Sequence, residues 1–515
     1  MKTIFGLVGA APFSFRRCLW LCLPALIVGA VLRISLLTAI PEAFYGSDSN
    51  SYFETARDVY LKGDLRMPPK RRYLYPVLLI AAPIVPFCTT PQIVALVQHA
   101  AGLAMLLGIG WIVGHLVRRP NLWVPLVTLC AAIWPRMLYY EHEMLGECLL
   151  LGVFIIAGAL AAPPGALTDR RRLGWFLLAA LGIMMVKPAG RPLWLGLFLA
   201  AMLLTRNPLA WPRLYFLFIP AAVLLAKNSG GDGQGPWLFL SSALPLVRAE
   251  GEPFARERAL LRPAIEEARA DLPNYAFNQQ FFKKILIRGR PDSQLGPEYV
   301  ALVKDKRHFS KVANALAKGA VLESPLQFGR LVWEKTLVAA SDRVHDARLL
   351  PAHFWSSQAE SSEGRWQARP KEMALLYETD EAGYDKLVAE RAQRTAWFKP
   401  YVRWVSKIHW VSAEPGAIGQ RPSIGLTALG WLAVLGLVGA LVPGRFARTS
   451  ILWLPILLYI PLVFAVGDRV SRYYHPLEWA MFALIAIGLD TLLDALTALW
   501  NRGRPAIATN TAAVG

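Results

Sequence analysis

One carboxylate of this 515-residue chain stands where it could react, just after the first long apolar run ends at Ile40. This residue, Asp48, precedes Tyr52 by four positions, which is one turn of a helix. Positions 48, 52, 56 and 59 share one helical face, so Asp48 and Tyr52 are expected to point the same way. The pattern fits two roles: a cap for this helix, or a general base.

Further ionisable residues interrupt or flank other apolar runs, and their charge is costly near a bilayer unless it serves a purpose. For each of them a simpler role also exists: Arg33 could reach the headgroups instead of pairing within the protein, and Lys187 and Arg191 could be headgroup anchors. Glu141, His142 and Glu143 resemble metal ligands, but three adjacent residues at a helix end cannot all face one ion, so no metal site is expected. The candidates are Arg33, Arg72, Glu147, Lys187, Arg191, Arg472 and His475.

The composition identifies the element type that must position these residues. The chain is 55% hydrophobic and only 18% charged, with a mean hydropathy of +0.36. Repeated apolar runs long enough to cross a bilayer predict an all-α polytopic membrane protein. The net charge of +19 is no argument for nucleic acid, because much of the excess Arg lies in short loops between apolar runs. The five cysteines form no disulfide framework and no CxxC metal motif.

About ten transmembrane spans are predicted, and several are short. The fifth and sixth look like two short helices that meet at Lys187 and Pro188. Residues 1–227 form a membrane module whose first outer loop is 41–90, residues 228–423 an extracytoplasmic segment with amphipathic helices, and residues 424–515 the last spans with a short tail. The spans are Cys18–Ile40, Ile93–Val117, Leu122–Leu138, Met144–Ala162, Leu173–Val186, Pro192–Leu204, Leu214–Ala226, Ile424–Val442, Ile451–Val466 and Pro476–Leu499.

The distribution of Arg predicts the orientation. Six basic clusters fall on one side if the spans alternate, and the positive-inside rule makes that side cytoplasmic. Both termini are then cytoplasmic, and Asp48, Lys187, Arg191, Arg472 and His475 gather on the outer face. The clusters are Arg16/Arg17, Arg118/Arg119, Arg170–Arg172, Arg206/Arg213, Arg445/Arg448 and Arg502/Arg504.

One carboxylate and several cations at an outer membrane surface suit the transfer of a sugar from a polyprenyl phosphate. The carboxylate takes the proton of an acceptor hydroxyl as that hydroxyl attacks the anomeric carbon. The leaving phosphate is already acidic, so it needs stabilisation by Arg and Lys and no proton. Nucleotide-sugar chemistry is disfavoured, because no Gly-rich phosphate loop precedes a Lys and a Ser or Thr.

The stretches "VLRISLL" and "YGSDSNSYFETARDVYLKGD" resemble the first span and first outer loop of the GT-C fold glycosyltransferases. Within them, the resemblance is to the group that contains the protein O-mannosyltransferases and lipid A aminoarabinose transferases. It continues in "RRYLYPVLL", "VKPAGRPLWLGLFLA" and "GDRVSRYYHPLEWAMFALIA", so it covers most of the membrane part in order. Many members have Asp-Glu where this chain has Asp48-Ser49, so their acceptor and metal habits do not carry over.

The resemblance implies a GT-C-like bundle in a bacterial inner membrane, with Asp48 as catalytic base and inversion at the anomeric carbon. By position it implies Lys187, Arg191 and Arg472 as ligands of the lipid phosphate, with Tyr52, Glu147, Arg33, Arg72 and His475 as possible helpers. The expected partners are a lipid-linked sugar donor, membrane lipids and a glycan, lipid or protein acceptor; no cofactor is expected, although a divalent cation is possible. Two alternatives stay open: a ligase or polymerase using a diphosphate-linked donor, and a lipid or solute transporter.

Overall fold

The computed structural model describes residues 13–43, 49, 52, 55–56, 74–81, 90–205, 235–288, 297–341, 381–394, 396, 400–401, 404, 407–416, 420–466 and 474–502. Asp48, Arg72, Arg472 and the predicted span Leu214–Ala226 lie outside these residues.

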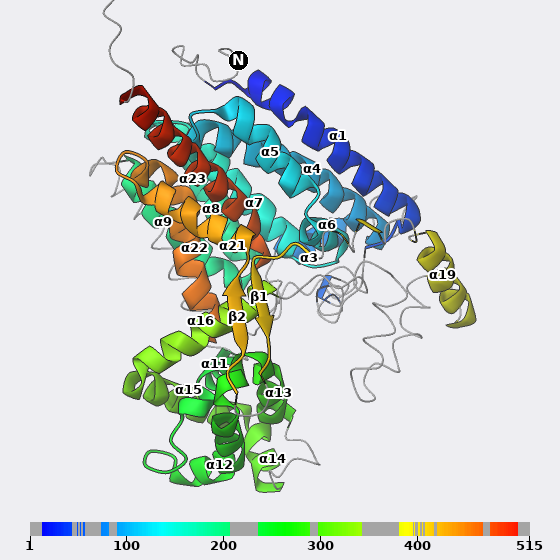
Figure 1. The fold of residues 1–515 in the computed structure, drawn as a ribbon. Coiled ribbons are helices and arrows are strands. Elements are labelled where there is room, and N and C mark those ends of the chain that lie inside the picture. The colour runs from blue at the N-terminus through cyan, green and yellow to red at the C-terminus, as the bar shows by residue number, and fades with distance from the viewer. Residues whose placement is uncertain are drawn as a thin grey trace, which may run out of the picture.

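The chain is an all-α membrane protein, and its described residues form one small sheet beside the helices (Figure 1). Within the described residues, four helices are long and apolar enough to cross a bilayer: α1 (Phe15–Ala39), α4 (Thr90–Leu116), α22 (Phe446–Val466) and α23 (His475–Arg502). A bent pair, α5 (Pro120–Ala132) and α6 (Pro135–His142), provides a fifth candidate. The prediction of an all-α membrane protein is therefore confirmed.

Shorter helices complete the bundle. The apolar helices α7 (Glu147–Ala161), α9 (Arg191–Thr205) and α21 (Ala428–Leu441) have 15, 15 and 14 residues, fewer than the ~20 that cross a bilayer unaided. The helix α8 (Arg170–Val186) begins at Asp169, whose side chain accepts a hydrogen bond from the backbone N–H of Arg171. The remaining short turns of this region are η2 (Ala166–Thr168) and η3 (Pro188–Gly190).

The predicted break at Lys187 and Pro188 is a hairpin between two helices. Helix α8 ends at Val186, η3 makes the turn, and α9 then returns towards η2, the turn that precedes α8. Proline explains the break, because it offers no N–H and disfavours helical geometry in the residue before it. Gly190 lets the turn close tightly, since a Cβ there would lie 2.4 Å from the carbonyl oxygen of Ile183.

One predicted span boundary is wrong. Residues 424–426, assigned to the start of a span, belong to strand β2 (Ser423–Leu426), which pairs antiparallel with β1 (Val411–Glu414), Val411 facing Leu426. Helix α21 begins only after Thr427, whose side chain accepts a bond from the backbone N–H of Gly430. Hydropathy alone could not separate a half-buried apolar strand from the first turn of a helix.

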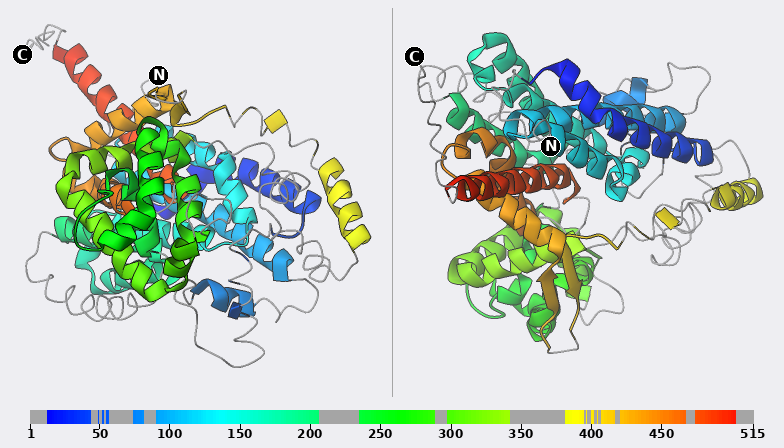
Figure 2. Two further views of the ribbon diagram at one scale, coloured as in Figure 1. Left: turned by 90° about the horizontal axis from the view of Figure 1, so that it is seen from below. Right: turned by 45° about the horizontal axis from the view of Figure 1, so that its top comes forward.

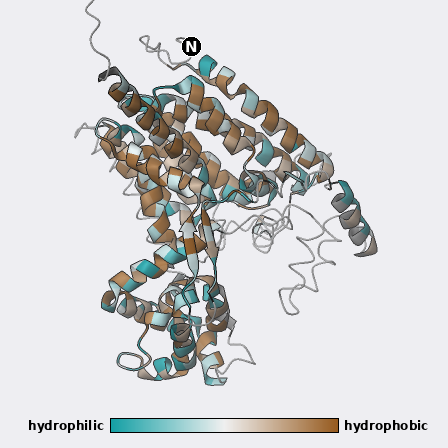
Figure 3. Ribbon diagram, viewed as in Figure 1, coloured by the Kyte–Doolittle hydropathy of each residue, from teal (hydrophilic) through white to brown (hydrophobic). Residues whose placement is uncertain are grey.

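The helical annex, which we define as residues 235–341, lies at one end of the bundle (Figures 1 and 2). Its residues are more hydrophilic than those of the bundle (Figure 3), and its helix α16 packs against α22 and β1. Helices α3 (Leu74–Ala81) and α19 (Glu381–Arg394) lie outside it. Its elements are α11 (Gly235–Ala243), η4 (Leu244–Leu246), α12 (Ala255–Ala270), η5 (Leu272–Asn274), α13 (Tyr275–Arg288), α14 (Pro297–Lys304), α15 (Lys306–Glu323) and α16 (Pro325–Ser341).

The opposite end of the bundle carries the start of α1 and the end of α23 (Figure 1). There Asp490 and Asp494 of α23 hold three of the arginines that the sequence assigned to one side. Arg119 Nη1 lies 3.0 Å from Asp490 and 2.9 Å from Asp494, and Arg445 Nη2 lies 3.0 Å and 2.8 Å from the same two carboxylates. Arg118 adds a bond of 3.0 Å to Asp494. These ion pairs join α23 to the connection between α4 and α5 and to the connection between α21 and α22. Their role is therefore structural.

Candidate active site at the annex end of the bundle

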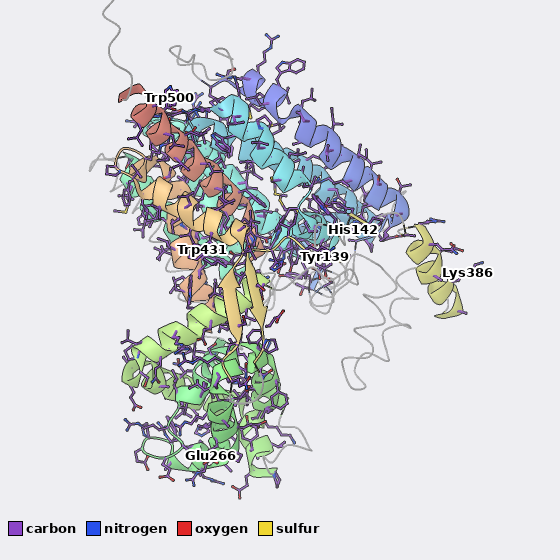
Figure 4. The ribbon with its side chains drawn as sticks, in the orientation of Figure 1. Tyr139, His142, Glu266, Lys386, Trp431 and Trp500 are labelled. Atoms are coloured by element: carbon purple, nitrogen blue, oxygen red, sulfur yellow. The ribbon has the colours of Figure 1, made fainter. Side chains whose placement is uncertain are left out.

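Helix α6 is the centre of the candidate site. All eight of its residues are buried, including Arg136, Glu141 and His142. Helix α5 ends at Ala132, Pro135 begins α6, and the two helices meet at a bend of 51°. Figure 4 shows Tyr139 and His142 of α6 at the end of the bundle near the annex, far from Trp500 at the other end. Charged residues of an apolar span are thus directed into the protein, where they need partners.

Three of the buried carboxylates at this end pair with basic side chains, and Glu141 is the first of them. Arg33 of α1 donates two bonds to it, from Nε at 2.7 Å and from Nη2 at 2.6 Å. Both side chains are only 1% exposed, so Arg33 pairs within the protein and does not reach for headgroups. Gly102 of α4 makes room for this carboxylate, because a Cβ there would lie 2.2 Å from Glu141 Cδ.

Two histidines extend this pair into a chain of four side chains. His99 Nδ1 lies 3.0 Å from Glu141 Oε2, and His99 Nε2 lies 2.8 Å from His142 Nδ1. The neighbouring Gln98 donates its amide N–H groups to the carbonyl oxygens of Glu141 and Glu143, at 3.0 Å and 2.9 Å. Helix α4 therefore fixes the turn that follows α6.

Glu478, the second carboxylate, lies in the first turn of α23 and is fully buried. It receives Arg136 Nη1 at 3.0 Å and the indole N–H of Trp410 at 3.1 Å, while His475 Nδ1 lies 3.2 Å away. The His475 ring also lies 4.6 Å from that of Tyr140, centroid to centroid. These contacts join α6, the residue before β1, and the start of α23.

Glu147, the third carboxylate, begins α7 and pairs with Lys187 at the end of α8. Ser49, the residue after Asp48, lies close to the start of α7. Its hydroxyl donates to the carbonyl oxygen of Met144 at 2.8 Å. A Cβ on Gly146 would lie 3.6 Å from the Tyr52 hydroxyl and 3.4 Å from Val186, the residue before Lys187. Tyr52, Glu147 and Lys187 therefore come together.

The remaining predicted site residues fall into two sets: some lie in the candidate site, and others lie outside the described residues. His475 lies with Glu478, and Arg191, half-buried, begins α9 four residues after Lys187. Asp48, Arg72 and Arg472 lie outside the described residues, so their roles stay predictions. Sequence reasoning missed four polar residues of the site, although each interrupts an apolar stretch and could have been found for that reason. They are Gln98, His99, Arg136 and Glu478.

No group of three His, Cys, Asp or Glu side chains suited to a metal ion occurs in the part of the chain that the structure describes. The carboxylate of Glu141 is instead occupied by Arg33 and His99.

The sequence matches no protein-family model and no curated protein. Among solved structures, the chain is similar to the crystal structure of ArnT from Cupriavidus metallidurans bound to undecaprenyl phosphate. The two share 14% sequence identity over 93% of this chain and 79% of the other, with a TM-score of 0.32.

Proposed function

We propose that this protein is a membrane glycosyltransferase that moves a sugar from a polyprenyl phosphate to an acceptor hydroxyl on the non-cytoplasmic face. The observation that carries the proposal is the meeting of Tyr52, Glu147 and Lys187 beside Ser49, at one end of an apolar bundle. The phosphate of a lipid-linked donor lies at the membrane surface, where the end of an apolar bundle is expected. A buried Lys at the tip of a helical hairpin suits an anionic ligand, because low dielectric strengthens the attraction.

In this mechanism Asp48 accepts the proton of the acceptor hydroxyl. The hydroxyl oxygen bonds to the anomeric carbon as the bond from that carbon to the phosphate oxygen breaks, so the configuration inverts in one displacement. The polyprenyl phosphate leaves with the bonding electrons, and Lys187, Arg191 and Arg472 stabilise its charge. The proton ends on Asp48.

Glu147 pairs with Lys187 and holds its side chain in place before the donor arrives. When the phosphate binds, it competes with Glu147 for the Lys187 ammonium, and Glu147 keeps the side chain directed at the site. Glu141 and Glu478 are bound by Arg33 and Arg136 and have no part in proton transfer.

The test is transfer by purified wild-type protein and by Asp48→Asn, with labelled polyprenyl-phosphate sugars and membrane extract as the source of acceptor. A general base contributes about 10²–10⁴-fold, so Asp48→Asn should lose activity by that factor. Asp64→Asn, an amide substitution in the same loop, is the matched control and should stay near wild type. Full transfer by Asp48→Asn would eliminate Asp48 as the base.

A further inference from the structure

An apolar groove between α4 and α7 begins beside the Glu147–Lys187 pair. Its volume is about 240 Å³, and residues of α3 line the end nearest the candidate site. Tyr75, Gln98 and Cys148 line that end. Cys148 follows Glu147 in the chain, and Tyr75 Cβ lies 3.9 Å from a Cβ built on Gly146. The groove is therefore continuous with the candidate site.

From that end the groove runs along both helices towards the middle of the bundle. Its lining on α4 extends from Val97 to Gly108, and on α7 from Cys148 to Ala159. At 1.5 Å per residue each wall is about 15 Å long, half the ~30 Å of a hydrocarbon layer. Small residues make the floor, and the side opens outward where Val97 and Ile156 are 42% and 54% exposed.

We propose that this groove holds the first isoprene units of the donor's polyprenyl chain, an inference that rests on the proposed function. A ligand that enters from the bilayer with its phosphate at Lys187 has its first carbons at the Tyr75 end. A cavity of about 150 Å³ holds one benzene, so about 240 Å³ holds roughly ten carbon atoms, which is two isoprene units. The polyprenyl chain moves from the lipid, one apolar medium, into the groove, which is another, so the transfer itself adds little to the affinity. The groove therefore serves mainly to fix the position of the donor.

The glycines of the lining differ in whether a larger side chain fits there, so one of them can be used to fill the groove. A Cβ on Gly152 of α7 would meet only Met105 Sδ, at 3.7 Å, so a larger side chain fits there without disturbing the backbone. By contrast, a Cβ on Gly108 would lie 2.5 Å from Ile155 Cγ2. Gly152→Leu therefore occupies the groove. Gly174→Leu on α8 is the matched control, because a Cβ there has no heavy atom within 4 Å.

The experiment uses the full chain in phosphatidylglycerol vesicles, with a polyprenyl phosphate that carries a diazirine on its second isoprene unit. After irradiation, peptide mass spectrometry should find the label within residues 97–108 or 148–159, displaced by unlabelled polyprenyl phosphate. Gly152→Leu should reduce labelling at least tenfold, and Gly174→Leu should stay within twofold of wild type. Ala104→Leu, which fills the groove from α4, provides a second variant if Gly152→Leu fails to fold.

Three results would overturn the proposal: labelling outside the groove, labelling that Gly152→Leu and Ala104→Leu both leave intact, or equal labelling by an acyl-chain phospholipid probe that polyprenyl phosphate does not displace. The last result would make the groove a site for ordinary bilayer lipid. Failure of the groove is distinguishable from failure of the function. Sugar transfer with the label elsewhere rejects the groove alone, and displaceable labelling in the groove without sugar transfer rejects the function alone.

Discussion

The pair between Arg33 and Glu141 should respond asymmetrically to the loss of either partner. Glu141→Gln leaves Arg33 buried at 1% exposure, and a guanidinium cannot give up its proton. Removing one partner of a buried pair costs about 3–5 kcal/mol, and we expect this range for the free energy of unfolding. Arg33→Met leaves a carboxylate that can take up a proton and that still has His99 at 3.0 Å. We expect about 1–3 kcal/mol for this variant.

The double variant should be less destabilised than the sum of the two, because neither buried charge remains without its partner. The assay is unfolding in mixed detergent micelles, followed by tryptophan fluorescence, for wild type, both single variants and the double variant. Arg330 and Glu334 provide the matched control: they pair at 2.8 Å on the annex helix α16, but the Arg330 side chain is 61% exposed. Glu334→Gln should cost less than about 1 kcal/mol.

The reasoning fails if Arg33→Met destabilises the protein as much as Glu141→Gln does. It also fails if the two effects add, since side chains joined by two hydrogen bonds must couple.

Two further predictions concern packing and pH. Gly436→Ala should lower the thermal stability, because its Cβ would lie 2.4 Å from the Leu484 carbonyl carbon and force α21 away from α23. Gly174→Ala, where a Cβ has no heavy atom within 4 Å, should be neutral or stabilising. Thermal unfolding in detergent compares the two variants. In the annex, the hydrogen bond from His308 lowers the pKa of Glu257, so this carboxylate stabilises the fold above its unfolded pKa of about 4.3 and stops doing so as the pH falls through its folded value. The half-exposed His308 is screened by water, so Glu257→Gln should cost under about 1 kcal/mol at pH 6. The difference from wild type should shrink steadily in unfolding curves measured as the pH falls below about 4.3.

The apolar spans could be predicted from the sequence because hydropathy depends on composition alone. The start of α21 could not, since Ile424 and Leu426 look the same in a strand as in a helix, and only their pairing with residues 411–414 decides. Proline marked the α8–α9 hairpin correctly. At Pro135 the same signal was present, yet the bend between α5 and α6 was missed inside one predicted span.

The candidate site shows a similar division. Glu147 and Lys187 could be singled out because they end apolar stretches, but their pairing depends on how α7 packs against α8. Arg33 had two plausible partners, lipid or protein, and Glu141 lies 108 positions away in the chain. His99 and Glu478 were missed because each was counted as part of a span. An ionisable side chain within a span needs a partner, and this rule would have marked both.

The most direct test of the central claim is reconstitution of the wild-type protein in vesicles with a labelled polyprenyl-phosphate sugar and an acceptor-containing extract. The claim predicts a new glycosidic bond, release of polyprenyl phosphate, and an anomeric configuration in the product opposite to that of the donor, read by NMR. Movement of the labelled lipid across the membrane with no new glycosidic bond would contradict it and identify a transporter.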